Sequence, residues 1–593
     1  MDDEKTSVPA ADKSDHDALA SLQRREEGAE LDVEANSVRT DRTQRDGGDL
    51  ENQDGMGPQR SNTTGGSMWS SEQMSLPQEI LFVATVCLTQ FCNRASPMNQ
   101  LQFLKNPPCC HLLFLEKASF CAMLFLLDTV GDSLGVTNPA LLSWLVAGFS
   151  LTAGTFLIFS GRLGDAFGYK LMLMIGFSWF SLWSVVAGVA VYSGYTLFVF
   201  ARVFQGIGSA ICIPNALAIL GAAYPPGHRK AMVFALFGAS APVGAMTGGI
   251  TGTALDLLWW PWNFHALAIV LALLTALTYF VVPSPRPPRL SGKVSLRRLN
   301  NELDLVGALA GVSALILFNF AWNQAPIVGW KSAQVTVTLV AGVVVFFTFT
   351  WTEYRYAVNP LLPLDAFNAD AGFVLSALAC GWAMFGVFSL YAVLVFENIR
   401  GLSPLHTAFW MMPVLVTGLI ASVLTGFLLG PAKFTPPAVM TIALIAFTTG
   451  LTILATAPVD QIYWAQTFVS IVIIPFGMDM SFPAATLILS NAVKKEHQGI
   501  AASLVATVVN YSISLGVGFA GTVEVHINNG GKTKADLLKG YKGALYLGVG
   551  LAGLGLVICL VFLARDKWRN SQKARGDKAT PSASPGPEAQ AFA

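Results

Sequence analysis

Two charged side chains interrupt long apolar runs of this chain. Asp479 lies in the run 461–490, between Gly477 and Pro483, and Arg202 lies near the start of the run 196–222. A charge inside such a run is costly unless a partner or water compensates it. A carboxylate at the position of Asp479 either takes up and releases a proton or accepts hydrogen bonds from a neighbouring helix, and the sequence leaves both roles open.

Arg202 carries a charge that costs roughly 2.5–3.5 kcal/mol inside a membrane helix, so it needs an acid, a carbonyl group or water as its partner. Gln205 follows one helical turn later and shares its face of the predicted helix. The alternative is that the side chain of Arg202 extends to the membrane interface, because it lies close to the start of the run. We expect Arg202 and Gln205 to take part in proton coupling or in solute binding.

Few other polar residues interrupt the apolar runs. The further candidates for proton coupling or solute binding are Gln90, Asn93, Asn319 and Asn510. The sequence contains no nucleophile with a nearby base, no metal-ligand spacing and no phosphate-binding loop. We therefore expect no enzyme, no metal site, no cofactor and no ATP-driven pump.

The elements that must position these side chains are helices that cross a membrane. The 593 residues are 53% hydrophobic and only 12% charged, with a net charge of zero, whereas soluble domains carry about 25% charged residues. The hydrophobic residues gather in runs of about 20 residues or more, which is the length of a membrane helix. The pattern predicts an all-α polytopic membrane protein of about fourteen helices, without a nucleic-acid partner.

A glycine-rich polar stretch separates the runs 139–160 and 171–192. We expect a tight loop there, with Arg162 and Lys170 marking the cytoplasmic side and Asp165 as an acid just outside the membrane. The stretch resembles the signature between helices 2 and 3 of the major facilitator superfamily, where it implies a conformational role. The matching residues are Gly161, Leu163, Gly164, Asp165, Gly168 and Lys170, whereas Ala166 and Tyr169 stand where the family has cations.

Two further stretches resemble motifs of this superfamily. Residues 197–210, with Arg202 and Gln205, are similar to its second motif, whose arginine is tied to proton coupling. The stretch 238–249 is similar to the antiporter motif G-x-x-x-G-P-x-x-G-G, with Ala241 in place of a glycine. Small residues let helices touch and a proline kinks them, so the stretch predicts either a hinge or ordinary packing. The expected hinge residues are Gly238, Pro242, Gly244, Gly248 and Gly249.

The resemblance implies the 6+2+6 helix plan of the fourteen-helix drug:proton antiporters, and the basic segment 283–303 follows the sixth predicted helix. An even number of helices puts both termini on one side, and the loop charges place that side in the cytoplasm. The expected organisation is a disordered tail (1–78), a six-helix bundle (79–282), a basic loop (283–303), an inserted helix pair (304–353), a second six-helix bundle (354–565) and a disordered tail (566–593).

Residues 102–128 fit this plan poorly, because the family joins its first helix, expected here over 79–101, to the second through a much shorter loop. The segment carries Glu116 and Lys117 within an apolar run. We interpret it as an atypical insertion, either an extra interfacial segment or the product of a retained intron. Many antiporters also place an acid on helix 1, and 79–101 offers only Gln90, Asn93 and Arg94, so coupling through Asp479 and transport without a proton both stay open.

Residues 150–165 look like the fungal aminotriazole-resistance and boron-efflux branch. This resemblance implies a monomeric secondary transporter in the plasma membrane that exports a small organic or weak-acid toxicant, or a secondary metabolite, by alternating access in exchange for a proton. Its expected partners are a small-molecule solute, the lipid bilayer and the proton. The alternatives are uptake, for instance of a siderophore, and a non-transporting sensor on the same fold.

Overall fold

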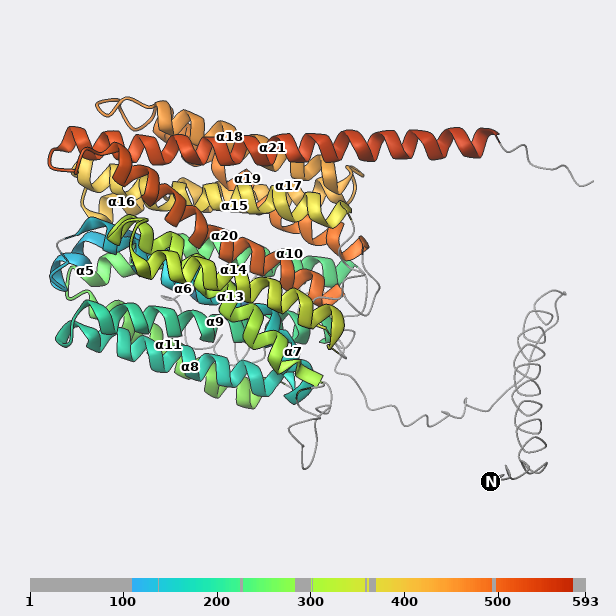
Figure 1. Cartoon of the computed structure of the whole chain (residues 1–593), viewed down its shortest axis with the longest axis horizontal. Helices are drawn as coiled ribbons and strands as arrows, with labels where there is room; N and C mark the ends of the chain where they lie inside the picture. Colours follow the sequence, from blue (N-terminus) through green and yellow to red (C-terminus); the bar gives the residue numbers. More distant parts are fainter. Residues whose placement is uncertain are drawn as a thin grey trace, which may run out of the picture. The chain divides into compact units, whose positions relative to one another are not determined.

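The computed structural model describes the backbone of residues 109–136, 138–223, 228–282, 300, 302–357, 360–361, 369–492 and 498–579. Gln90, Asn93, the predicted helix 79–101, the N-terminal tail and most of the basic loop lie outside the described residues. What is described is almost entirely helical, as predicted (Figure 1).

The first bundle is built from small residues that let long helices approach closely. Gly206 and Gly208 of α9 meet α6 and α8, and the glycines of α10 meet α4. One bent pair, α6–α7, changes direction by 45° at Phe156. The elements of this bundle are α4 (Cys109–Phe125), the short α5 (Leu127–Ser133), η3 (Pro139–Leu142), α6 (Ser143–Thr155), α7 (Leu157–Phe167), α8 (Tyr169–Val189), η4 (Ala190–Tyr192), α9 (Tyr195–Ala223), α10 (His228–Asp256) and α11 (Pro261–Val281).

In the second bundle, too, glycines such as Gly386 and Gly516 let helices approach closely. Its innermost helix, α15, packs against α19, α20 and α21, and ends in a short π-helical turn, η6 (Val395–Ile399). The elements are α15 (Ala369–Leu394), α16 (Pro404–Trp410), α17 (Pro413–Leu429), α18 (Pro436–Thr456), α19 (Gln466–Ala492), α20 (Gln498–Ile527) and α21 (Lys534–Ala579). Between the two bundles in the sequence lie α13 (Leu305–Val328) and α14 (Ala333–Arg355), the inserted pair.

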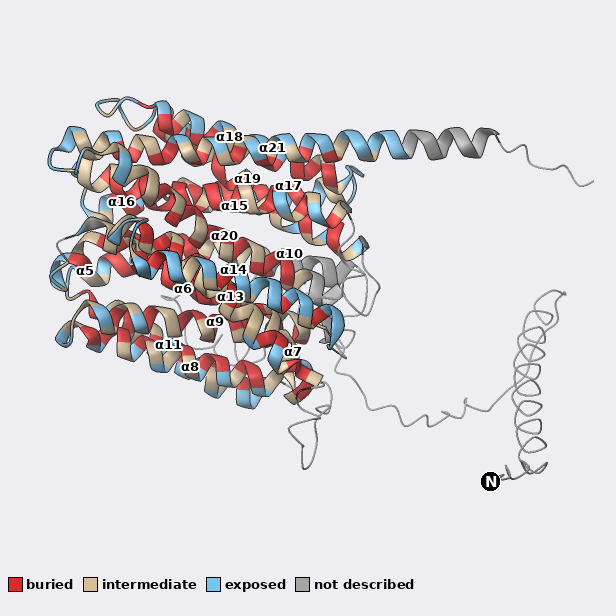
Figure 2. Cartoon of the chain, in the orientation of Figure 1, coloured by how far each residue is buried: buried red, intermediate tan, exposed pale blue. Residues whose placement is uncertain are grey.

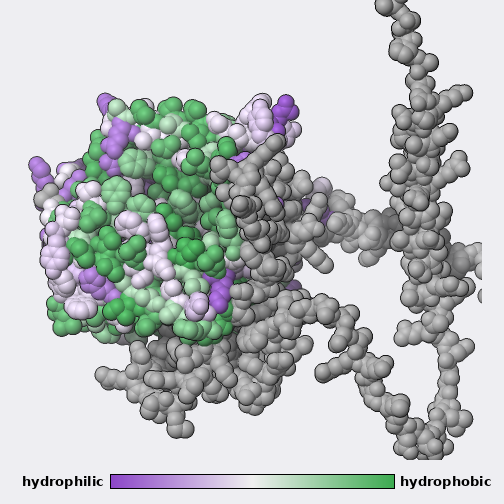
Figure 3. All heavy atoms as spheres, turned by 90° about the horizontal axis from the view of Figure 1, so that it is seen from below, coloured by the Kyte–Doolittle hydropathy of each residue, from purple (hydrophilic) through white to green (hydrophobic). Residues whose placement is uncertain are grey.

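Among the described residues, eleven helices are long and apolar enough to cross a membrane, and the bent pair α6–α7 makes a twelfth. α4 and α10, which pack against each other inside the first bundle, are not among these twelve, and with them the described helices of the two bundles and the inserted pair number fourteen. The outer faces of these helices expose large apolar side chains, such as Val337 and Phe347 on α14, and one face of the molecule is largely hydrophobic (Figures 2 and 3). This pattern fits a surface surrounded by lipid.

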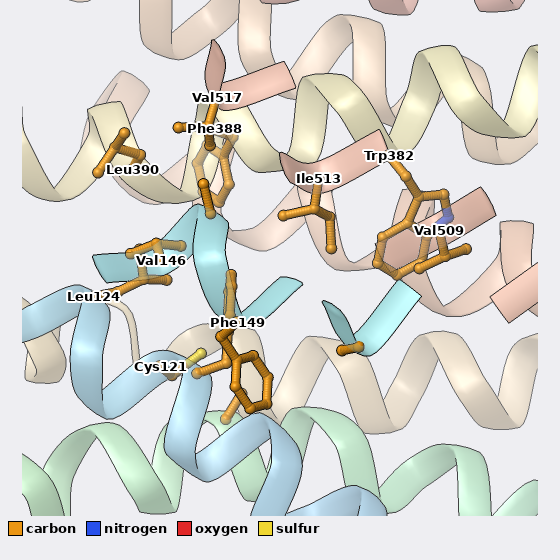
Figure 4. Packing of buried hydrophobic residues seen from close by; sticks show 14 of the residues in the cluster. Cys121, Leu124, Val146, Phe149, Trp382, Phe388, Leu390, Val509, Ile513 and Val517 are labelled. Atoms are coloured by element: carbon orange, nitrogen blue, oxygen red, sulfur yellow. The ribbon is translucent and has the colours of Figure 1, made fainter. Parts of the chain in front are cut away.

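The two bundles meet along helices of both sides. α6 packs against α20, and α10 packs against α16 and α17. Side chains of α4, α6, α15 and α20, including Cys121, Phe149, Phe388 and Ile513, fill the space between them (Figure 4). We call this contact the seam. The two ends of the bundles are named after the turns found there, the Gly168 end and the Gly401 end.

Three sequence expectations differ from the structure. The described part of the segment 102–128 is no insertion outside the bundle, because α4 lies against α10, where Gly248 faces Ala118. The expected loop 161–170 is mostly helix, and the chain reverses at Gly168 alone, whose φ is 101°. The expected C-terminal tail is helical as far as Ala579, and Arg569 near its start pairs with Asp370 of α15 (2.9 Å).

The contact of α10 with α4 gives a direct test of this packing. An added Cβ on Gly248 would lie 2.2 Å from Ala118 Cα, whereas nothing lies within 4 Å of a Cβ on Gly238. We expect Gly248→Val to lower the free energy of unfolding by at least ~1–3 kcal/mol through overpacking. The matched control Gly238→Ala should leave it unchanged or slightly higher, by up to about 1 kcal/mol. Thermal unfolding in detergent measures both, and equal melting temperatures would contradict the position of α4.

Candidate functional site

A buried guanidinium ties three helices of the first bundle together. Arg202 on α9 is 0% exposed, and it donates to Leu145 O of α6 (3.1 Å), Ser119 Oγ of α4 (3.1 Å) and Gln205 Oε1 (2.7 Å). Gln205 in turn donates to Ser184 Oγ of α8 at 2.8 Å. Arg202 thus points into the bundle, and the alternative of a side chain that extends to the interface is wrong.

The remaining surroundings of Arg202 are aromatic and neutral. Its guanidinium lies 4.8 Å from the ring centroid of Phe149 and 5.9 Å from that of Phe264. Among the described residues no carboxylate pairs with Arg202, and its Nη2 has no hydrogen-bond partner. The charge is therefore stabilised by dipoles and π faces, which is a weaker arrangement than an ion pair.

A buried acid lies on α4, the helix that supplies Ser119. Glu116 lies one helical turn before Ser119, is 0% exposed, and pairs with Lys117 at 3.1 Å. Glu116 and Ser119 are three residues apart and share a face of α4, but among the described residues no hydrogen bond or ion pair joins Glu116 to Arg202. Sequence reasoning had set the segment aside as an insertion, although an acid in an apolar run was a usable signal.

Asp479 on α19 lies where the two bundles touch. A Cβ added to Gly418 of α17 would lie 3.0 Å from Asp479 Oδ2 and 2.7 Å from the Cβ of Pro242 on α10. Asp479 Oδ2 has no hydrogen-bond partner among the described residues. The structure thus brings Asp479 together with the proline of the 238–249 stretch, and it does not bring Asp479 to Arg202.

In the structure, the glycines of the 238–249 stretch serve for packing against a neighbouring helix, and the helix that contains them is continuous. α10 runs as one helix through Pro242. Added Cβ atoms on Gly244 and Gly249 would lie 2.3 Å and 2.4 Å from Phe114 O and the Phe125 ring, so both glycines face α4. These contacts are those of ordinary small-residue packing, and the hinge role stays a prediction.

The glycine-rich stretch lies at the Gly168 end. Tyr169 donates a hydrogen bond to Asp165, so a phenol takes the place of the expected cation. A Cβ on Gly164 would overlap Asn215 Oδ1 of α9 at 1.8 Å, which explains a glycine there. Lys170 donates to Tyr279 O of α11 at 2.9 Å, and Leu163 packs beside Ala166 and Leu303.

Two predicted amides lie at the seam. Asn319 on α13 is 0% exposed and accepts from Ser514 Oγ of α20 at 2.9 Å. Asn510 donates to Ala506 O of its own helix at 3.2 Å, and its backbone lies opposite Gly154 of α6. Neither amide contacts Arg202 or Asp479, so the predicted site residues fall into three separate groups.

Residues 113–517 match the family model of the Major Facilitator Superfamily. The chain belongs to this superfamily. The match begins inside α4, which agrees with the place of this helix in the bundle. The peptide transporter POT in complex with sulfate superposes with a TM-score of 0.54 at 16% identity, over 77% of this chain and 94% of that one. This likeness confirms the major facilitator fold.

Three curated fungal transporters are similar over most of their length. A low affinity ammonium transporter of Saccharomyces cerevisiae is 47% identical, over 79% of this chain and 90% of that protein. The efflux pump terG of Aspergillus terreus is 42% identical, over 77% and 86%. The aminotriazole resistance protein of S. cerevisiae is 37% identical, over 82% and 84%. The expected resemblance to the fungal efflux group is thus confirmed.

The hydrogen bond between Arg202 and Ser119 predicts that the loss of this serine hydroxyl destabilises the protein. Ser119→Ala removes an acceptor from a buried charged donor, and we expect the free energy of unfolding to fall by ~1–3 kcal/mol. Ser240→Ala is the matched control, since among the described residues Ser240 Oγ bonds only to Phe237 O of its own helix (2.6 Å), and we expect a change within about 0.5 kcal/mol. Chemical unfolding in detergent compares the two, and equal losses would argue against the contact of α4 with Arg202.

Proposed function

We propose that this major facilitator protein exports a small organic or weak-acid solute across the membrane by alternating access, in exchange for a proton. The kinship with efflux pumps and the aminotriazole resistance protein supports export. We further propose a 6+2+6 organisation in which α4, in place of the expected helix 79–101, is the first helix of the first bundle, with both termini and the Gly168 end in the cytoplasm, and a monomer in the plasma membrane. The transporter fold supports secondary transport without a catalytic centre.

The observation that carries proton coupling is the place of Asp479 between α10, α17 and α19. α10 belongs to the first bundle, whereas α17 and α19 belong to the second. A carboxylate that gains or loses charge at this junction changes the cost of holding the bundles together there. The protonation of Asp479 is therefore positioned to bias the bundle contact, which is what coupling requires.

Arg202 takes a supporting part in this proposal. Its three acceptors lie on α4, α6 and α9, all in the first bundle. It thus fixes the internal geometry of that bundle, and an approach of Glu116 to its free Nη2 would supply the acid that the family places on helix 1.

Ammonium is the second candidate solute. The kinship with a low affinity ammonium transporter favours it. A group of acids at the Gly401 end also favours it, because Glu397 lies within Coulombic range of Asp128 and Asp256. Carboxylates gathered in one place attract cations, ammonium among them.

We expect Asp479→Asn to remove the dependence of transport on an imposed pH difference, because an amide takes up no proton. Membrane vesicles with the lumen at a set pH measure solute flux as the outside pH changes. Asp460→Asn is the matched control, since Asp460 is an exposed loop carboxylate, and it should keep the dependence. Flux through Asp479→Asn that still follows the pH difference would place the coupling group elsewhere.

A growth panel decides the solute and the direction. Cells with and without the gene are grown on borate, aminotriazole, ammonium as sole nitrogen source, and toxic metabolites, and their solute contents are measured. We expect better growth and lower content of one toxicant in expressing cells. Better growth and higher content with ammonium alone would establish the second candidate. Unchanged content for every compound would leave a sensor as the better interpretation.

A further inference from the structure

The inserted helix pair lies across the seam and contacts both bundles. α13 packs against α20 of the second bundle and against α6 of the first, while α14 packs against α13 (Figure 1). Any rocking of the bundles changes the distance between α6 and α20, so α13 must part from one of them. The contacts of α13 on each side show which one.

Three hydrogen bonds hold α13 on α20. Tyr511 donates to Leu315 O at 2.9 Å, Ser514 Oγ donates to Asn319 Oδ1 at 2.9 Å, and Asn323 Nδ2 donates to Ser514 O at 3.3 Å. Asn319, Asn323 and Ser514 are 0% exposed. Buried polar groups are costly to leave unpaired, so these bonds favour a fixed contact of α13 with the second bundle.

The packing of this contact is equally close. A Cβ on Gly518 of α20 would lie 3.1 Å from the backbone of Trp322, and one on Gly521 would lie 3.3 Å from Pro326. Backbones at this separation slide past each other only after they move apart. α13 therefore moves with α20.

The first bundle holds the pair at two separate points. Toward the Gly401 end, Trp144 Nε1 of α6 donates to Gln324 Oε1 of α13 at 3.2 Å. At the Gly168 end, Arg162 of α7 lies within Coulombic range of Glu353 on α14 and Asp304, the residue that caps α13. Glu353 is 7% exposed and Asp304 is 8% exposed.

Apolar side chains also pack at the contact between α7 and the inserted pair at the Gly168 end. Phe159 of α7 packs against the small cluster formed by Ala308, Phe349 and Leu361. Arg162 also donates to Pro360 O, which follows α14. The glycine-rich stretch at the end of α7 thus rests on the inserted pair, and the charge of its arginine is balanced there.

We propose that the inserted pair is a two-ended latch, carried by the second bundle, that holds the first bundle at the Gly168 end through Arg162 with Asp304 and Glu353, and toward the Gly401 end through Trp144 with Gln324. When the seam opens at one end, the contacts of the latch at that end break, while its contacts at the other end stay formed. Asp304, Glu353 and Gln324 are then positioning residues that set the balance between the two open forms. This proposal does not depend on the solute, the direction of transport or the proton.

The test compares two variants, each of which should favour opening at a different end of the seam. Glu353→Gln weakens the latch at the Gly168 end, and Gln324→Leu weakens the latch toward the Gly401 end. The matched controls lie on the exposed face of α14. Thr348→Val removes a hydroxyl whose one bond to a described residue goes to Val344 O, and Gln334→Leu repeats the amide-to-leucine change. Glu353→Asp keeps the charge and should behave like the unmodified chain.

Two cysteines introduced on α20 report, through their reaction with a maleimide, how often each end of the seam opens. Ser503→Cys lies opposite Gly161, and Val517→Cys lies in the buried seam toward the other end (Figure 4). Each is introduced into the full chain, purified in detergent and labelled with a maleimide, with the chain lacking the reporter as the blank. The probe is the maleimide alone, so a failure of the transport proposal leaves the result untouched.

We expect Glu353→Gln to raise the labelling rate of Ser503→Cys at least about twofold and to lower that of Val517→Cys. Gln324→Leu should do the reverse, and the controls should change neither. Labelling that rises at both reporters in both variants would show general loosening and overturn the latch. Unchanged labelling in monodisperse variants would overturn it as well.

Discussion

Backbone contact across the seam is the constraint on which the rest of this structure depends. A Cβ on Gly154 of α6 would lie 2.8 Å from the backbone nitrogen of Tyr511 on α20, and a Cβ on Gly386 of α15 would lie 2.4 Å from Ile513 O. Gly154 thus lets α20 approach α6 of the first bundle closely, and Gly386 lets α20 approach α15 of its own bundle. Contacts of this kind are made through shape, need no directional bonds, and can re-form after the helices move apart. One hydrogen bond also crosses the seam directly, from Ser514 Oγ to Ala147 O of α6 (3.1 Å), and the same serine bonds to Asn319 and Asn323 on α13.

The sequence predicted the fold class well because its strongest signals are local. Runs of about twenty apolar residues indicate membrane helices without any knowledge of their partners, and the spacing of Gly161, Gly164 and Asp165 is contained within a few residues. The same use of local sequence gave the wrong place for α4, which was expected to lie outside the bundle. Glu116 and Lys117 made its apolar run look unsuited to a bundle, whereas in the structure the two charges pair with each other and Ala118 faces the glycines of α10.

The candidate site was predicted less completely because its contacts join distant residues. Arg202 and Gln205 were found from one helix, but their partners Ser119 and Leu145 lie on others. Nothing in the sequence links Asp479 to Pro242, since the two are brought together only by the docking of α10 on α17. Asn319 was singled out as a polar residue in an apolar run, but its role in holding α13 on α20 required the position of Ser514.

The surroundings of the two intramembrane charges suggest different parts in a transport cycle. The hydrogen bonds of Arg202 all stay within the first bundle, so a rigid rotation of that bundle carries its partners along and leaves its energy nearly constant. Asp479 has neighbours on both bundles, and the same rotation changes what surrounds its carboxylate. A ligand or proton shifts a conformational equilibrium only through a difference in interaction between the two states. This argument favours Asp479 over Arg202 as the group through which a proton would act.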